Sequence, residues 1–230
     1  MKVIATIRTG FRSKFGVPRQ SGLLESVKGT IVFEPGYRDP SALRGLEEFS
    51  HIWIVWEFSQ AIRSEWSPTV RPPRLGGNVR MGVFATRSPF RPNPIGLSCV
   101  RLEGIDLKGP DGPVIHVSGA DLVDGTPIYD IKPYIPYTDC RTDASGGFTD
   151  SVDMHALDVT VPPDIAAGIP AGTLQAIRDI LSQDPRPRYQ QNPERTYSFE
   201  YDRYNIRFKV VADKLSVEGI TQMQHENSTR

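Results

Sequence analysis

The sequence predicts a mainly β protein, with an antiparallel sheet or barrel in its N-terminal part and a small α+β domain at its C-terminus. Short runs rich in Ile, Val and Trp recur through the first 140 residues. Clusters of Pro, Gly and Asp separate these runs as turns. The sequence lacks the repeated alternation of strands with helices that a doubly wound fold requires. An antiparallel architecture is therefore favoured.

The N-terminal part consists in order of strands, turns and one short helix. Pro40-Ser41 is expected to open a helix over residues 42–49. Two strong turn signals, Pro110-Asp111-Gly112 and Asp124-Gly125, separate the last strands. The expected strands cover residues 3–8, 29–33, 51–58, 81–86, 97–102, 114–117 and 128–131.

The C-terminal part follows a polar stretch, residues 139–164, which we expect to be an exposed connector or a lid. Apolar residues at positions 174, 177, 180 and 181 have helical spacing and predict a helix with one apolar face. After a linker over residues 184–193, residues 206–211 and 215–220 predict a hairpin around Asp213-Lys214. We therefore expect two domains, residues 1–165 and residues 166–230.

The composition is that of an ordinary globular protein. Of its 230 residues, 38% are hydrophobic and 23% are charged, which excludes disorder throughout the chain. No apolar run approaches the ~18–20 residues that a membrane span needs, and the N-terminal segment shows no signal-peptide core. Cys99 and Cys140 lie outside any CxxC pattern and fit a reducing compartment. We expect a cytoplasmic protein that does not contact membranes.

The formal net charge is zero, from 27 basic and 27 acidic residues, but the charges are segregated along the chain. Residues 66–102 carry six arginines and no carboxylate, whereas residues 103–165 carry three basic and twelve acidic residues. The planar guanidinium fork of arginine suits phosphate groups and base edges. The arginine-rich stretch therefore indicates either an anion-binding surface or neutralisation of the acidic stretch that follows.

Several common chemistries have no motif in this sequence. It contains no GxGxxG or Walker loop, no HExxH, no paired CxxC and no GxSxG. The four histidines have no metal-ligand spacing, so no metal site is expected. The unusual segment is ATRSPFRPNPIGLS, residues 85–98, in which three prolines within six residues stiffen the backbone. This loop either presents Arg87, Phe90, Arg91 and Asn93 to a ligand or simply connects two strands.

The run RSPFRPNPIGLS, preceded by RPPRLGGNVRMGVFAT and followed by DLVDGTPIYDIKPYIPYTD, closely resembles the TsaA-like (TrmO) family. The resemblance covers residues 1–140 strongly. It implies a single-sheet antiparallel β-barrel as the N-terminal domain of a homodimeric, S-adenosylmethionine-dependent tRNA methyltransferase. It also implies the reaction, which is methylation of N6 of N6-threonylcarbamoyladenosine (t6A37), next to the anticodon, to give m6t6A.

The resemblance further implies which residues hold S-adenosylmethionine. Many relatives carry histidine where this chain has Ser59, so only a backbone contact is implied there. Chemically, carboxylates suit the sulfonium or the ribose hydroxyls, and Arg87 suits the carboxylate of the cofactor. Asp124-Gly125 also fits a plain turn, in which the aspartate bonds nearby backbone. The implied residues are Pro18, Arg19, Gln20, Ser59, Gln60, Arg87, Leu97, Asp121, Leu122, Val123, Asp124 and Gly125.

The sequence does not identify a catalytic residue. N6 of a carbamoylated adenosine carries a proton and is a poor nucleophile, so a base or a hydrogen bond to its anion would help. The candidates are Tyr129, Asp130, Tyr134 and Tyr137, and the sequence does not choose among them. Trp53 and Trp56 fit either cation–π contact with the sulfonium or the core of a strand.

Contacts with tRNA are expected at two places. Arg71, Arg74, Arg91 and Asn93 are expected to hold the RNA or the threonyl carboxylate. The C-terminal domain interleaves basic and aromatic residues, which fits unpaired bases or, equally, a solvated hairpin with an aromatic core. Two other functions stay open, namely a non-catalytic module that binds S-adenosylmethionine or RNA and a methyltransferase with another acceptor.

Overall fold

In the computed structural model, which describes residues 1–72, 79–151, 156–186 and 192–223, the N-terminal part is a closed six-stranded barrel. Its neighbouring strands are antiparallel throughout. The predicted barrel is therefore confirmed. The strand order is β1 (Ala5–Thr9), β2 (Lys28–Phe33), β7 (Gly112–Ser118), β6 (Ile95–Gly109), β3 (His51–Glu57) and β8 (Thr126–Pro133).

Alternating side chains explain how these strands close around one core. In β3, Ile52, Ile54 and Trp56 are buried inside the barrel, while Trp53 and Val55 between them are half-buried. The branched isoleucine side chain packs well on a pleated surface. Each of five strands supplies fully buried isoleucine to the core, at Ile7, Ile31, Ile52, Ile54, Ile115 and Ile128.

The C-terminal part is a four-stranded sheet covered by one main helix. Helix α3 (Ala171–Ser182) buries Ile177, Ile180 and Leu181 on one face, which confirms the predicted helix. The antiparallel pair of β11 (Tyr204–Val211) and β12 (Lys214–Gln222) confirms the predicted hairpin. A short helix, α2 (Pro163–Ala166), precedes α3. The strand order is β10 (Tyr197–Tyr201), β11 (Tyr204–Val211), β12 (Lys214–Gln222) and β9 (Asp158–Thr160).

Strand β9 comes from the stretch that was expected to be a connector. It pairs in parallel with β12, and its neighbours Leu157 and Val161 are buried in the C-terminal core. The C-terminal sheet therefore includes residues before position 165, and the division of the chain at that position stays a prediction. Earlier in the same stretch lie α1 (Pro136–Asp139) and a 3₁₀ turn over Gly147–Ser151, both without buried side chains.

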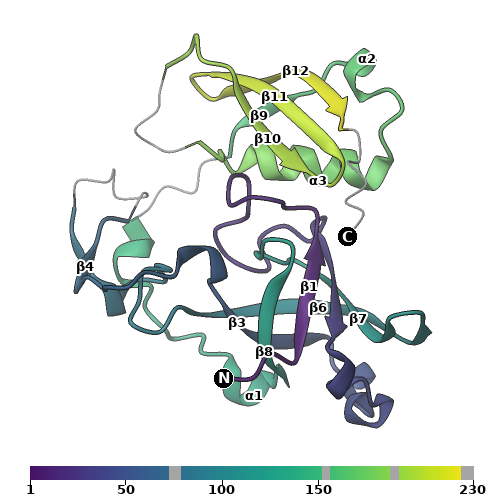
Figure 1. Cartoon of the computed structure of the whole chain (residues 1–230). Helices are drawn as coiled ribbons and strands as arrows, with labels where there is room; N and C mark the ends of the chain where they lie inside the picture. Colours follow the sequence, from purple (N-terminus) through teal and green to yellow (C-terminus); the bar gives the residue numbers. More distant parts are fainter. Residues whose placement is uncertain (73–78, 152–155, 187–191, 224–230) are drawn as a thin grey trace.

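The two parts share packing through the loop between β1 and β2. Phe11 from this loop is fully buried in the C-terminal core, and its ring centroid lies 5.1 Å from that of Tyr201. The backbone N–H of Asp202 donates to the carbonyl of Gly10 at 2.7 Å. A Cβ at Gly10 would lie 2.6 Å from the Tyr201 ring, so glycine permits this approach. Figure 1 shows α3 and the C-terminal sheet lying over these loops.

Two predicted elements were wrong. The helix expected over residues 42–49 is a pair of 3₁₀ turns, Pro40–Leu43 and Leu46–Glu48, because Gly45 between them has φ of 84°. The strand expected over residues 81–86 is only β5 (Met81–Gly82), since Val83–Ala85 form a 3₁₀ turn that the N–H of Thr86 closes on the carbonyl of Val83. Another 3₁₀ turn, Pro35–Tyr37, follows β2.

The segment between β3 and β6 projects from the barrel, as the position of β4 shows in Figure 1. We call its described residues, 59–72 and 79–94, the arm. The arm contains a 3₁₀ turn over Ser59–Ala61, the short pair of β4 (Thr69–Val70) and β5, and a second 3₁₀ turn over Val83–Ala85. Within the described ranges, no helix is long and apolar enough to cross a membrane.

Candidate functional site

Three residues that are distant in sequence meet at one end of the barrel. Arg87 from the arm donates a hydrogen bond through Nη1 to Oε1 of Gln20, which lies in the loop before β2. The positive charge of Arg87 also acts on the carboxylate of Asp121, which lies between β7 and β8. We call Gln20, Arg87 and Asp121 the polar cluster. All three belong to the set that the sequence analysis assigned to the cofactor.

Asp121 is the unusual member of the polar cluster. Burial raises the pKa of its carboxyl group to about 6, against the hydrogen bonds and the Arg87 charge that stabilise the carboxylate. The hydroxyl of Ser98 donates to Oδ1 of Asp121 at 2.5 Å. Ser98 was not among the expected site residues, although it ends the segment ATRSPFRPNPIGLS. A half-buried carboxylate with a raised pKa, on which the charge of an arginine acts, is typical of functional sites.

The arm holds Arg87 through contacts of its own backbone. The hydroxyl of Thr86 donates to the carbonyl of Val83 at 2.9 Å and closes the turn. Nη1 of Arg91 donates to the carbonyls of Val83 at 3.1 Å and Thr86 at 2.6 Å. Arg91 therefore stiffens the loop that carries Arg87. Its contact with RNA stays a prediction.

The loop before the polar cluster touches both parts of the molecule. Lys14 donates through Nζ to the carbonyl of Gln60, just after β3. Nη2 of Arg19 donates to the carbonyl of Asp184, after α3, at 3.3 Å. Pro18 is buried. A hollow of about 200 Å³ separates residues 14–19 from the end of α3 and is lined by Phe15, Val17, Pro18, Ile180 and Gln183, among others.

Ser59, Gln60 and Leu97 lie near the base of the arm. The turn that holds Ser59 and Gln60 is joined to the proline-rich loop, because the N–H of Phe58 donates to the carbonyl of Pro94 at 2.8 Å. Leu97 is opposite Val55 in the pairing of β6 with β3, and 56% of its surface is exposed. An exposed leucine beside polar groups can cover an apolar part of a ligand.

The side chains of the segment from Leu122 to Gly125 mainly stabilise the fold. Leu122 is buried in the barrel core, so any cofactor contact from it would come from its backbone. Oδ1 of Asp124 accepts a hydrogen bond from the N–H of Thr9 at 2.9 Å. Gly125 has φ of 73°, and the hydroxyl of Thr126 donates to the carbonyl of Val123 at 2.6 Å. The Asp124 carboxylate therefore ties the turn before β8 to β1 and does not bond the backbone of its own turn.

The four candidate bases lie along β8 and just after it. The carboxylate of Asp130 is 2.8 Å from Nζ of Lys132, and Tyr129 bonds Glu57. Partial burial raises the pKa of both Tyr129 and Tyr134. Tyr137 is 88% exposed. Within the residues that the structure describes, no hydrogen bond or ion pair joins these four to the polar cluster, and their role stays a prediction.

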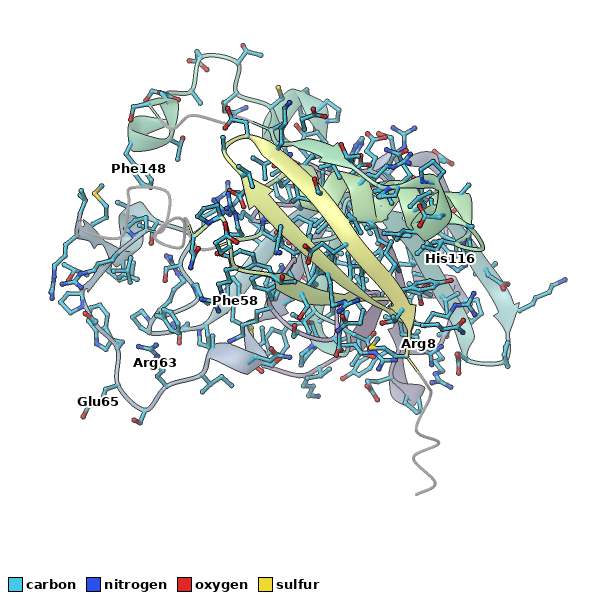
Figure 2. All side chains as sticks on the ribbon, turned by 90° about the horizontal axis from the view of Figure 1, so that it is seen from above. Arg8, Phe58, Arg63, Glu65, His116 and Phe148 are labelled. Atoms are coloured by element: carbon cyan, nitrogen blue, oxygen red, sulfur yellow. The ribbon has the colours of Figure 1, made fainter. Side chains whose placement is uncertain are left out.

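The arm exposes cations and large apolar side chains together. The guanidinium of Arg63 lies 3.7 Å from the ring centroid of Phe90. Phe84 is 73% exposed and pairs with Trp66, with ring centroids 6.1 Å apart. Arg71 and Asn93 are exposed, and Arg74 lies outside the described residues. Figure 2 shows Arg63 on the arm, on the opposite side of the molecule from Arg8 and His116.

The C-terminal sheet uses its aromatic residues as a core. Tyr197, Tyr201, Tyr204 and Phe208 are buried, so their rings are not available to stack on bases. Lys209 pairs with Glu218 at 3.1 Å, and Arg186 pairs with Asp184 at 2.8 Å. These contacts favour the hairpin with an aromatic core over a base-stacking surface. In the part of the chain that the structure describes, no group of His, Cys, Asp and Glu could hold a metal ion.

Comparison with known proteins identifies the family. Two family models match the chain, the tRNA-methyltransferase O N-terminal domain over residues 6–140 and the TrmO C-terminal domain over residues 163–223. A tRNA (adenine(37)-N6)-methyltransferase of Escherichia coli K12 is 44% identical over 216 residues, 90% of this chain and 91% of the relative. A putative S-adenosylmethionine-dependent methyltransferase of Pseudomonas aeruginosa is 41% identical over 210 residues, 84% of this chain and 85% of the relative. A crystal structure of TrmO from Pseudomonas aeruginosa has a TM-score of 0.78 at 32% identity and covers 96% of both chains. This chain belongs to the TrmO family of tRNA methyltransferases.

Proposed function

We propose that this chain transfers a methyl group from S-adenosylmethionine to N6 of t6A37 in tRNA and so produces m6t6A. The observation that carries the proposal is the polar cluster, in which the positive charge of Arg87 acts on the half-buried carboxylate of Asp121 at the base of a cationic arm. The relatives named as tRNA (adenine(37)-N6)-methyltransferases and as S-adenosylmethionine-dependent methyltransferases support the acceptor position and the cofactor.

The polar cluster fits the charges of S-adenosylmethionine, which carries a sulfonium, an ammonium and a carboxylate. Asp121 supplies a negative group for a cation, and Arg87 supplies a guanidinium fork for a carboxylate. Gln20 adds an amide that both donates and accepts. When bound, the cofactor supplies the methyl group. The remaining residues of the implied set would contribute backbone groups and the exposed side chain of Leu97.

On the acceptor side, the chain must hold N6 in place and manage its proton. Alignment of the acceptor with the donor is worth about 7–11 kcal/mol in such reactions. The raised pKa values of Tyr129 and Tyr134 keep their hydroxyls protonated at neutral pH, so these two residues can donate hydrogen bonds but not act as bases. Asp130 and Tyr137 complete the set of candidates, and the role of general base stays unassigned.

We also propose that Arg71, Arg91 and Asn93 of the arm bind the tRNA, together with Arg74, which lies outside the described residues. The segment from residue 66 to residue 102 carries six arginines and no carboxylate. Such a surface attracts the phosphate backbone and makes affinity fall with added salt. A tRNA substrate also agrees with the expected cytoplasmic location.

A homodimer is part of the same proposal. Ile62, Trp66, Phe84 and Leu97 leave large apolar surfaces exposed on the arm and at its base. Trp66 and Phe84 are neighbours, with ring centroids 6.1 Å apart, and exposed apolar side chains that gather in this way are typical of protein interfaces. Sedimentation equilibrium should give a mass near that of two 25.6 kDa chains. A mass of one chain at micromolar concentration would remove the dimer from the proposal.

The test of the reaction is transfer of labelled methyl groups to tRNA from cells with and without the threonylcarbamoyl modification. We expect incorporation only into the modified tRNA, and much less with the Asp121→Asn variant. Equal incorporation into unmodified tRNA would correct the acceptor. If neither tRNA is labelled although both the cofactor and the tRNA bind, the methyltransferase assignment for this chain is wrong.

A further inference from the structure

Ser98 occupies a fully buried position between two other side chains of the barrel. Nε1 of Trp56 donates a hydrogen bond to the hydroxyl oxygen of Ser98 at 2.9 Å. The hydroxyl of Ser98 donates in turn to Oδ1 of Asp121 at 2.5 Å. An indole N–H can only donate, so it leaves the single hydroxyl proton of Ser98 for the carboxylate. While Asp121 is ionised, the hydrogen bonds of this relay therefore run in one direction, from Trp56 through Ser98 to Asp121.

The pairing of β3 with β6 builds this relay. Trp56 is opposite Gly96, two residues before Ser98, so Gly96 and Ser98 lie on the same face of β6. A Cβ at Gly96 would lie 2.2 Å from the indole of Trp56. Only glycine leaves room for the indole to lie across β6 and reach Ser98. Gly96 therefore leaves room for the indole of Trp56, and Ser98 accepts the hydrogen bond from it.

The groups around Asp121 make its charge sensitive to this relay. The neutral donors that stabilise the carboxylate are the Ser98 hydroxyl, which has the largest effect, and the backbone N–H groups of Asp121 itself and of Ser21, while Arg87 supplies a positive charge. The Ser21 hydroxyl accepts a hydrogen bond from the N–H of Cys99 at 3.0 Å, which ties this loop to β6. Burial opposes the charged form and raises the pKa of Asp121 to about 6. A change in donor strength therefore changes the ionised fraction of Asp121 close to neutral pH.

We propose that Ser98, oriented by Trp56, is a positioning residue that keeps the Asp121 carboxylate charged and directed toward the cationic part of the cofactor. This inference rests on the proposed function, in which Asp121 meets S-adenosylmethionine. Asp121 must lose its proton to attract a cation, so affinity is present above the pKa of Asp121 and falls as the pH drops through it. Removing the Ser98 donor raises that pKa, and the loss of affinity then begins at a higher pH.

The experiment measures the affinity for S-adenosylmethionine by calorimetry from pH 5 to pH 8.5. In the wild type the affinity should fall with a midpoint near the pKa of Asp121, about 6. The Ser98→Ala variant should move this midpoint upward by about 1–2 pH units, since a hydrogen bond to a charged group is lost. The Trp56→Phe variant keeps an aromatic ring but loses the donor, so its shift should be smaller and in the same direction.

Ser118 provides a matched control. It is also a fully buried barrel serine, and its hydroxyl donates to the Glu103 carboxylate at 2.5 Å. Ser118→Ala therefore removes a hydrogen bond of the same kind and length at a carboxylate outside the polar cluster. It should change thermal stability about as much as Ser98→Ala does and leave the midpoint of cofactor affinity where it is.

A second readout needs no cofactor, namely titration of the Asp121 carboxyl carbon by NMR in the protein alone. We expect its midpoint to rise in both Ser98→Ala and Trp56→Phe. If the wild type binds the cofactor and neither midpoint moves in the folded variants, the relay has no such role, while the proposed function stands. If the wild type does not bind the cofactor, the proposed function fails, and the NMR titration still decides whether Ser98 sets the charge of Asp121.

Discussion

Phe11 gives the most direct test of how the two parts of this protein are joined. It follows β1 of the barrel in the chain, yet its side chain is fully buried in the C-terminal core with Ile177 and Phe208. Phe11→Ala would leave a cavity there and remove the ring contact with Tyr201 at 5.1 Å. Substitutions of this kind cost about 3–5 kcal/mol of unfolding free energy. For a chain of this size, that is a fall in melting temperature of about 6–20 °C.

The assay is urea unfolding followed by fluorescence and circular dichroism. Phe11→Ala should lower the free energy of unfolding by the expected amount, with both probes showing one transition. Phe84→Ala is the control, because Phe84 is 73% exposed and should change stability by less than about 0.5 kcal/mol. A loss below about 1 kcal/mol for Phe11→Ala would show that this ring does not hold the two parts together.

Three further results should follow from the structure. Gly96→Ala should lower stability by about 1–3 kcal/mol in thermal unfolding, because the added methyl group overpacks against the indole of Trp56. Gly104→Ala is its control, since a Cβ at Gly104 would have no atom within 4 Å. Equal losses of stability in the two variants would contradict this packing. Arg87→Gln should weaken S-adenosylmethionine binding about 10- to 100-fold by calorimetry. The fall in affinity at low pH should also begin at a higher pH, because Asp121 loses a nearby positive charge. Unchanged affinity would remove Arg87 from the site. Arg71→Ala should reduce the slope of log tRNA affinity against log salt concentration by about 1 in filter binding. Arg8→Ala is the control and should leave the slope unchanged, because Arg8 pairs with Asp111 at 2.6 Å on the opposite side of the molecule. If the slope for Arg71→Ala equals that of the wild type, Arg71 does not contact the RNA.

Most of the fold could be predicted because its signals are local. Strands alternate apolar and polar residues, and turns carry Pro, Gly and Asp, so each element is visible within a few residues. The errors have physical causes at single positions. Gly45 adopts φ of 84° and breaks the expected helix, and the 3₁₀ turn over Val83–Ala85 ends the expected strand after Gly82. Strand β9 was missed because only its parallel pairing with β12 makes those three residues a strand.

The site was only partly visible in the sequence. The resemblance supplied Gln20, Arg87 and Asp121, and the structure brings these three together. It supplied Leu122 as well, although the side chain of Leu122 belongs to the barrel core. Ser98 was missed because a lone serine in a strand carries no signal of its own. Strand pairing brings Ser98 within hydrogen-bonding distance of Trp56, 42 positions before it, and of Asp121, 23 positions after it.

By itself, the sequence determined the family, the barrel, the C-terminal helix and hairpin, and the segregation of charge into an arginine-rich and an acidic stretch. These depend on local periodicity and on contiguous motifs. Only the tertiary structure decided that Phe11 belongs to the C-terminal core and that Trp56, Ser98 and Asp121 form one hydrogen-bonded chain. The physical reason is that burial and hydrogen bonding depend on distances in space, and strand pairing brings together residues that no pattern along the chain connects.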